Sequence, residues 1–463
     1  MQGLLPEYEI NPATWFYLSS LLTVGIFFKF HRPASIRNFD LLALIAFSPG
    51  LLWVSRGFRG GYDWLFLLTI VFLFRTLLDP LLVRRPLLEP NLNTSGLTFT
   101  TFALLAFLLG GLVSDRVPEL AQVGVLDRAE VARLRRPLLY QLGFIGSLPH
   151  EARASAASAE ANAEGQNSSP GANTRRPEVV LVRTLVVFTH LLTVLGLIYV
   201  GHLHFENIHT AMGMTALYLL LPYTVQMAAR LDHFLPGAIL LWAIGCYRQP
   251  LLAGLLLGTG GWIVGYPFFL VPLWMSFYFR RGLVRFSLGL ILSLVFTWLL
   301  VWLATTIAWM AGVADPGTTW ENWSHLLRWL VWKLPQADGF WAERIQAFRI
   351  PVVAAFVALA ASYAIWPTHK NLGSLISCSA TLLLGVQLWH PYQGGLYLGW
   401  YLPLVILTIF RPNLDDRLAI SVVSETWLSP RTQLWLSAWL EDWGLWPLQR
   451  WWYRPKSRED ERG

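Results

Sequence analysis

The stretch HLHFENIHT, residues 202–210, concentrates three histidines and one glutamate in an otherwise apolar chain. On a continuous helix His202, Glu206 and His209 would share one face, a metal-ligand arrangement, while His204 would point elsewhere. The order of residues does not match the HExxH of zincins, and a di-iron bundle would need a second ExxH and two further glutamates. The sequence therefore favours a polar connection between helices at the membrane surface over a metal site, and we predict no metal ligands and no cofactor.

A second set of polar groups lies near the ends of apolar segments. Carboxylates at membrane depth are costly and tend to be kept for a partner or a reaction, although each one alone is more often a solvated helix end. The turn WHPYQGG, residues 389–395, adds a histidine, a tyrosine and a glutamine to the acidic positions. The candidate residues are Asp63, Asp115, Asp232, His233, His390, Tyr392 and Gln393.

The composition indicates a membrane protein. Of the 463 residues, 55% are hydrophobic and only 14% charged, well below the usual quarter. Many of the 24 tryptophans lie near the ends of apolar runs, as expected of interface anchors. The net charge of +7 is not arranged as a basic stripe beside exposed aromatics, so we expect membrane lipid and not nucleic acid as a partner. Cys246 and Cys378 lie in apolar runs and imply neither a disulfide framework nor a thiolate site.

Apolar runs between polar or Pro/Gly breaks predict an all-α, polytopic transmembrane bundle of about thirteen spans. The predicted spans are 14–30, 39–54, 62–78, 95–113, 180–201, 210–229, 234–247, 250–264, 266–279, 286–310, 350–366, 371–389 and 395–410. The motif GTGGWIVGYP interrupts 250–279, which is either a hairpin of half-spans or one broken helix. Gly254 and Gly258 form a small-xxx-small pair that predicts close helix packing.

These spans divide the chain into six parts. Spans one to four occupy 1–113, an extracytoplasmic loop with a disordered linker at 150–178 occupies 114–179, and a central bundle occupies 180–310. A Trp-rich extracytoplasmic loop at 311–349 lies along the membrane surface or caps a cavity, and the C-terminal spans follow at 350–410. In the tail, 411–463, four tryptophans at helical spacing predict an amphipathic helix on the cytoplasmic face.

Arginine and lysine in short loops predict the orientation, because such loops resist translocation. The basic loops around Arg32, Arg84, Arg280, Lys370 and Arg411 all fall on one side when thirteen spans alternate. The amino terminus then lies outside and the carboxyl terminus in the cytoplasm. The seven candidate residues lie together on the outer side, where they could line a shared cavity, whereas HLHFENIHT lies inside.

Residues 210–282 carry an ordered set of features. A span is followed by a polar turn with Gln226 and Asp232, a basic break at Arg248, the run AGLLLG, the pair Tyr266 and Pro267, and a closing Arg-Arg. Together with LWHPYQGGLYLGWYLPLVILTIF near the end, this order resembles the GT-C class of membrane glycosyltransferases, in particular the polyprenol-phosphate-mannose-dependent glycosyltransferase family 87. The resemblance covers about half the chain and lacks a paired acidic motif after Asp115.

The resemblance implies a GT-C-like fold in the bacterial inner membrane and an inverting transfer of one sugar from a polyprenyl phosphate to an extracytoplasmic acceptor. An acidic residue in the first large outer loop would be the general base, and Asp115 is the nearest match in place.

Two alternatives remain open from the sequence: a transporter or lipid-handling protein, which would suit a broken helix near Gly260, and a noncatalytic scaffold acting through the Trp-rich tail.

Overall fold

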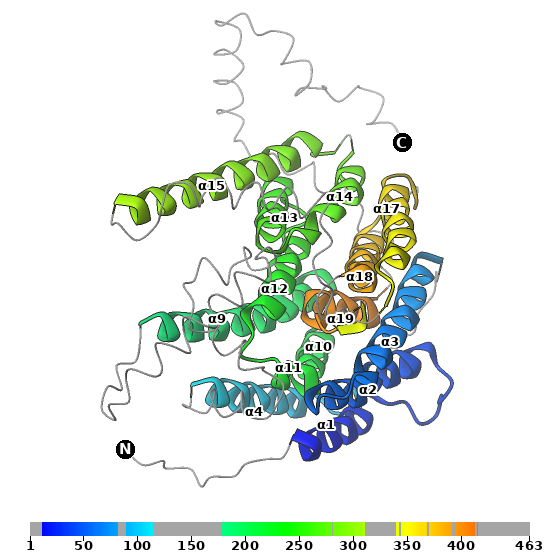
Figure 1. Ribbon diagram of the computed structural model, residues 1–463. Coiled ribbons are helices and arrows are strands. Elements are labelled where there is room, and N and C mark those ends of the chain that lie inside the picture. The colour runs from blue at the N-terminus through cyan, green and yellow to red at the C-terminus, as the bar shows by residue number, and fades with distance from the viewer. Residues whose placement is uncertain are drawn as a thin grey trace, which may run out of the picture. The chain divides into compact units, whose positions relative to one another are not determined.

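The computed structural model describes residues 12–81, 89–113, 177–279, 281–310, 339–341, 344–367, 370–390, 395–412 and 414. All regular secondary structure in these ranges is helical (Figure 1). The longer helices are α1 (Pro12–Phe27), α2 (Ile36–Ser55), α3 (Gly60–Leu77), α4 (Thr94–Val113), α9 (Pro177–Tyr199), α10 (Ile208–Leu220), α12 (Leu231–Gly245), α13 (Pro250–Val264), α15 (Leu283–Met310), α17 (Arg349–Ile365) and α18 (Leu372–Trp389). Shorter segments are α11 (Pro222–Gln226), α14 (Val271–Phe277), α19 (Leu402–Phe410), η1 (Asp79–Leu81), η3 (Val200–His204), η4 (Tyr266–Leu270), η5 (Gly339–Trp341), η6 (Gln346–Phe348) and η7 (Leu398–Trp400).

The predicted all-α class is confirmed for the described residues, and each predicted span contains helix, although 210–229, 266–279 and 395–410 are each divided between two short segments. Five helices there are long and apolar enough to cross a membrane: Ile36–Ser55, Gly60–Leu77, Thr94–Val113, Arg183–His204 and Leu372–Trp389. The other apolar helices are shorter than 18 residues, except α15, which has 28 residues. The helix α19 has only 9 residues, about 14 Å against a hydrocarbon layer of about 30 Å. Several predicted spans are therefore short buried helices.

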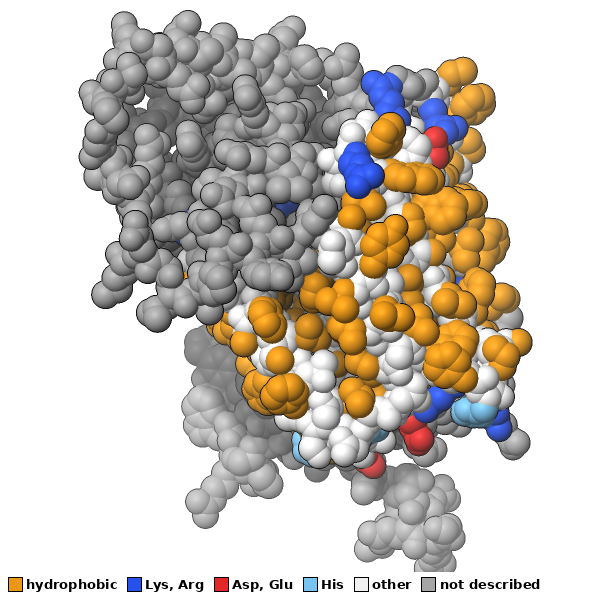
Figure 2. Space-filling view, turned by 90° about the horizontal axis from the view of Figure 1, so that it is seen from below, with side chains coloured by type: hydrophobic (Ala, Val, Ile, Leu, Met, Phe, Trp, Pro, Cys, Tyr) orange, Lys and Arg blue, Asp and Glu red, His pale blue; other side chains and the backbone are white. Residues whose placement is uncertain are grey.

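The surface is that of an integral membrane protein. Large apolar side chains are widely exposed, among them Tyr17, Phe99, Phe107 and Ile365, each more than three-quarters accessible. Such surface is unfavourable in water but is solvated by lipid chains. Figure 2 shows an expanse of hydrophobic side chains on one face, with the charged side chains and histidines toward its upper and lower ends.

The segment 250–279 forms a hairpin, which settles the alternative that the sequence left open. Helix α13 ends at Gly265, whose φ of 83° is a conformation that favours glycine. The η4–α14 segment returns antiparallel, since the hydroxyl of Tyr278, just after α14, donates to the carbonyl of Tyr247, just before α13, at 2.7 Å. The packing role of Gly254 is also confirmed, because an added Cβ would meet the carbonyl oxygen of Phe286 on α15.

The buried centre of the bundle consists of α10, α18 and α19, with α12 beside them (Figure 1). Every residue from Leu372 to Leu388 is buried, as is every residue of α19. Helices this enclosed can hold polar side chains at fixed positions, because close packing leaves them little freedom.

The two ends of α12 define two ends of the bundle. Asp232, in its first turn, lies near His390 and the start of α19, and we call this the His390 end. At the other end of the same helix the carbonyl of Gly245 accepts a hydrogen bond from the ring of His204 at 2.8 Å, and we call this the His204 end. The two ends are about 20 Å apart, given 1.5 Å per helical residue.

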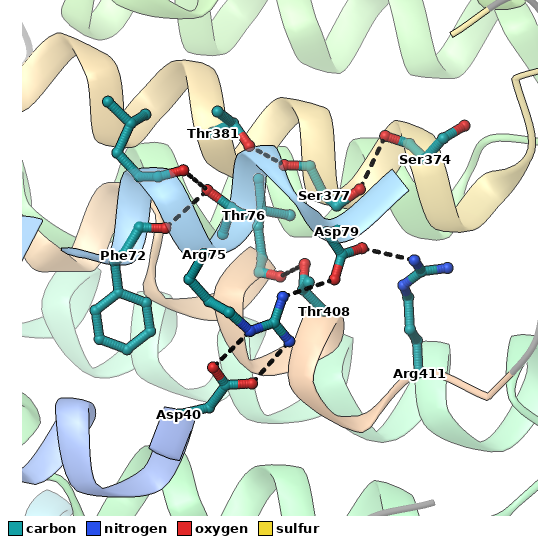
Figure 3. A network of polar contacts seen from close by, with 12 residues as sticks. Asp40, Phe72, Arg75, Thr76, Asp79, Ser374, Ser377, Thr381, Thr408 and Arg411 are labelled. Atoms are coloured by element: carbon teal, nitrogen blue, oxygen red, sulfur yellow. Dashed lines mark hydrogen bonds and ion pairs between the residues drawn. The ribbon is translucent and has the colours of Figure 1, made fainter. Parts of the chain in front are cut away.

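Away from the His390 end, a buried cluster of four charges joins three parts of the chain (Figure 3). Arg75, in the last turn of α3, contacts both carboxylate oxygens of Asp40 on α2 at 2.8 Å each. It also donates to Asp79 at 3.1 Å, and Arg411, just after α19, donates to the other oxygen of Asp79 at 2.6 Å. All four side chains are buried and their formal charges cancel. We interpret this ion cluster as a structural contact that joins α2, the end of α3 and the end of α19.

Candidate site at the His390 end

His233 and its neighbours are fixed by hydrogen bonds that converge on the first turn of α12. The backbone N–H of Gly399 donates to the Tyr223 hydroxyl at 3.0 Å, and that hydroxyl is 2.7 Å from Nδ1 of His233. Because an amide N–H can only donate, the tyrosine hydrogen is available for Nδ1, which favours the tautomer with hydrogen on Nε2. The indole N–H of Trp400 donates to the backbone carbonyl of Asp232 at 2.8 Å.

Two glycines, Gly237 on α12 and Gly399 on η7, allow these two helices to pack closely. A Cβ on Gly237 would meet the carbonyl oxygen of Gly399, and a Cβ on Gly399 would meet the carbonyl oxygen of His233. The two backbones therefore touch without intervening side chains. This contact places Tyr397 and Trp400 beside the histidine.

An aromatic cluster, which we define as His233, Tyr397, His390, Trp400 and Tyr266, forms at this end. The ring of Tyr397 lies 4.6 Å from those of His233 and Trp400 and 5.0 Å from that of His390. Tyr266, from η4, lies 5.2 Å from His390 and 5.3 Å from Trp400. The rings come from α12, the end of α18, η7 and η4, so the fold and not a local motif assembles the cluster.

Asp232 presents a carboxylate at the edge of this cluster. Nη2 and Nε of Arg230 contact its two oxygens at 3.0 Å and 3.4 Å, and its side chain is 37% exposed. Nε2 of His233 is 3.9 Å from the nearer oxygen, longer than a hydrogen bond. The carboxylate is thus oriented by a buried arginine and remains open to solvent on one side.

Asp63 lies at the same end but outside the aromatic cluster. It pairs with Arg344 at 2.7 Å, and both side chains are about half exposed. Nearby, Phe66 of α3 stacks on Phe340, and the indole N–H of Trp341 donates to the carbonyl of Leu388 at 3.0 Å. The described end of the Trp-rich loop thus covers the ends of α3 and α18.

The structure therefore brings together three of the predicted site residues, Asp232, His233 and His390, and leaves Asp63 in a separate ion pair. Asp115, Tyr392 and Gln393 lie outside the described residues, as do the linker up to residue 176 and the Trp-rich tail.

His202, Glu206 and His209 do not share one helix face, because the helix is not continuous across them. Helix α9 gives way to the π-turn η3, Glu206 has a positive φ of 56°, and α10 begins only after Asn207, which caps it through Thr210. No group of three metal-ligating side chains occurs in the part of the chain that the structure describes. The segment is a connection between helices: His204 is buried on a backbone carbonyl, and Nδ1 of His209 lies 3.1 Å from the Thr94 hydroxyl.

Arg230, Tyr397 and Trp400 also belong to the site, and they were not predicted from the sequence. The aromatic run LYLGWYLP directly after the polar WHPYQGG turn was a usable signal, since Tyr397 and Trp400 are three apart. Their meeting with His233, however, depends on a contact between segments about 165 residues apart along the chain, which no local spacing encodes.

Aromatic faces, a partly open carboxylate and imidazole nitrogens are the groups that bind a polar ligand with apolar faces and that orient hydroxyl groups. The fold and site thus define a polytopic helical membrane protein with a candidate binding site at one end of the bundle. Comparisons of the chain with protein-family models, with curated proteins and with solved structures found no match.

Proposed function

We propose that this membrane protein transfers one sugar from a polyprenyl-phosphate donor to an acceptor hydroxyl, with inversion at the anomeric carbon. The observation that carries the proposal is the aromatic cluster beside Asp232 at one end of a lipid-embedded bundle. Sugar rings have apolar C–H faces that stack on aromatic rings and hydroxyls that need fixed polar partners, and Tyr397, the half-buried ring of the cluster, and the exposed carboxylate of Asp232 are groups of these two kinds.

The His390 end suits a lipid-linked donor because apolar surface and polar groups meet there. A polyprenyl chain would stay in lipid beside the exposed apolar side chains, while the phosphate and sugar reach the polar end. Arg230 supplies a guanidinium beside Asp232, the type of group that stabilises a departing phosphate.

In the reaction, the acceptor oxygen forms a bond to the anomeric carbon and the bond from that carbon to the phosphate oxygen breaks. The polyprenyl phosphate leaves with the electron pair, and a carboxylate takes the acceptor proton. By the resemblance that carboxylate is Asp115, with the His390 end facing outward from a bacterial inner membrane. Asp232 orients the substrates and does not act as the base.

The test is transfer by the purified protein in lipid nanodiscs, with radiolabelled polyprenyl-phosphate sugars and a panel of lipid and water-soluble acceptors. We expect Asp115→Asn to lower kcat by about 10²-fold or more, the usual contribution of a general base, and Asp232→Asn to raise KM. Glu206→Gln, at the His204 end, is the matched control and should retain parent activity.

Absence of transfer to every acceptor by the parent would end the enzyme proposal. Equal activity in Asp115→Asn and the parent would remove Asp115 from the reaction without touching the role of the His390 end.

A further inference from the structure

Two side chains from outside α18 cap the carboxyl end of this helix. The last carbonyl groups of a helix have no partner within the helix, so they need donors from elsewhere. The indole N–H of Trp341 donates to the carbonyl of Leu388 at 3.0 Å. Nε and Nη2 of Arg349 donate to the carbonyl of Trp389 at 3.2 Å and 2.9 Å. Both donor side chains are buried, and a guanidinium at this end of a helix is also favoured by the helix dipole.

The capped end of α18 is the point from which His390 enters the aromatic cluster. His390 directly follows Trp389, and its ψ of 128° turns the chain out of the helix. Its ring lies 5.2 Å from that of Tyr266 and 5.0 Å from that of Tyr397. The carbonyl that Arg349 holds belongs to the planar peptide group that also contains the Cα of His390. A shift of this carbonyl would therefore move the His390 ring.

The two donors belong to a segment that is itself attached to α3. We call residues 339–341 and 344–349 the capping segment. Phe340 stacks on Phe66 of α3, with 3.6 Å between the ring centres. The ring of Trp341 lies edge-on to both, 6.2 Å from Phe66 and 5.1 Å from Phe340. The packed rings thus hold the indole of Trp341 at the end of α18.

We propose that Trp341 and Arg349 are positioning residues of the His390 end, an inference that rests on the proposed function. They act through the backbone of α18: their hydrogen bonds hold the last peptide groups of the helix, and these groups hold His390 against Tyr266 and Tyr397. When either donor is lost, a buried carbonyl must find another partner, and the last turn of α18 has to move for it to do so. Neither residue is one of the five rings of the aromatic cluster.

The position of the His390 ring is measured by NMR on the protein in nanodiscs, with ¹³C-labelled histidine. Its imidazole signals are assigned by their loss in His390→Gln, and the neighbouring aromatic rings shift them through ring currents. Trp341→Phe keeps an aromatic ring but removes the N–H donor, so the signals should move toward those of free histidine. Trp242→Phe is the matched control, because the indole N–H of Trp242 donates to the carbonyl of Leu192 at 2.9 Å, between α12 and α9. It should leave the signals in place.

Arg349 is tested by a pair of variants that separates positioning from stability. Arg349→Met removes the donors, whereas Arg349→Lys keeps the positive charge and can donate to the same carbonyl, although not through two nitrogens. The His390 signals should move in Arg349→Met and lie closer to those of the parent in Arg349→Lys. A role in stability alone would lower the Tm of these variants without moving the histidine signals.

Transfer gives the kinetic readout. Trp341→Phe should lower kcat/KM by about 10-fold or more, since a displacement of about 1 Å at a site can cost about 10²-fold, and Trp242→Phe should keep the parent value. His390 signals that stay in place in both Trp341→Phe and Arg349→Met would overturn the inference and leave the transferase standing. Moved signals with the kcat/KM of the parent would overturn it as well. If the parent transfers no sugar, the enzyme proposal ends, and the NMR signals alone decide whether the two residues position His390.

Discussion

The ion cluster makes a sharp prediction about stability, because it contains a buried carboxylate between two arginines. Asp79 has no exposed surface and accepts from Arg75 at 3.1 Å and from Arg411 at 2.6 Å. Replacing Asp79 by asparagine keeps the shape of the side chain but removes its charge. Asp40 is then the one carboxylate left in the cluster for the guanidinium groups of Arg75 and Arg411. The cluster then holds one uncompensated positive charge, and we expect the free energy of unfolding to fall by about 3–5 kcal/mol.

Asp63→Asn is the control variant that separates the effect of burial from the effect of contact length. The pair of Asp63 and Arg344 has nearly the same length, 2.7 Å, but both side chains are about half exposed. Exposed pairs are screened by water, so this substitution should cost only about 0–1 kcal/mol. Equal distances with unequal losses would show that burial and not contact length determines the effect.

Unfolding is measured by tryptophan fluorescence as the protein is titrated from mild detergent into SDS. The double variant Asp79→Leu, Arg411→Met removes one charge of each sign, and it should regain most of the lost stability, since a buried pair replaced by apolar groups is often neutral. If the free energy of unfolding of Asp79→Asn lies no more than about 1 kcal/mol below that of Asp63→Asn, the buried pair behaves like an exposed one, and burial does not determine the effect.

Two further predictions concern the site and the orientation. Gly237→Ala should force η7 away from α12, because the new Cβ would meet the carbonyl oxygen of Gly399, so kcat/KM of transfer should fall. Gly25→Ala, whose Cβ would meet no atom within 4 Å, should leave kcat/KM unchanged. Single cysteines at Asp63 and Glu206, in a chain whose native cysteines are replaced, should react with an impermeant maleimide from opposite sides of sealed vesicles, position 63 from outside. Labelling of both from the same side would contradict the orientation.

The extent of the helices could be predicted from the sequence because apolar runs bounded by polar residues determine them. The predicted span 371–389 coincides with Leu372–Trp389, and 39–54 with Ile36–Ser55. The apolar runs did not distinguish a helix that crosses the bilayer from a short helix enclosed in the bundle, such as α19. An apolar run shows only that its residues are removed from water. Both the lipid and the protein interior exclude water, so the run does not show which of them surrounds the helix.

The metal-site alternative at HLHFENIHT depended on one helix across the whole stretch, and the structure shows the connection between helices that the sequence favoured. Asn207 followed by Thr210 is an N-cap signal for a new helix, and it was readable in the sequence. The ion cluster was not readable in the same way, since Asp79 and Arg411 are 332 positions apart. The candidate residues Asp232, His233 and His390 were found only because the alternation of spans groups helix ends by side, a global rule that needs no knowledge of contacts.

The ion cluster and the His390 end differ in how their buried polar groups are satisfied. In the ion cluster, Asp40, Arg75, Asp79 and Arg411 pair with one another across three parts of the chain, although Nε of Arg411 has no hydrogen-bond partner among the described residues. At the His390 end, Gln387 and Nε2 of His233 have no such partners within the described residues. Both places carry the desolvation cost of buried polar groups, and in the ion cluster the ion pairs offset part of that cost. The carboxylate of Asp232 is 37% exposed, whereas every carboxylate of the ion cluster is buried, so the His390 end is the place to look for chemistry.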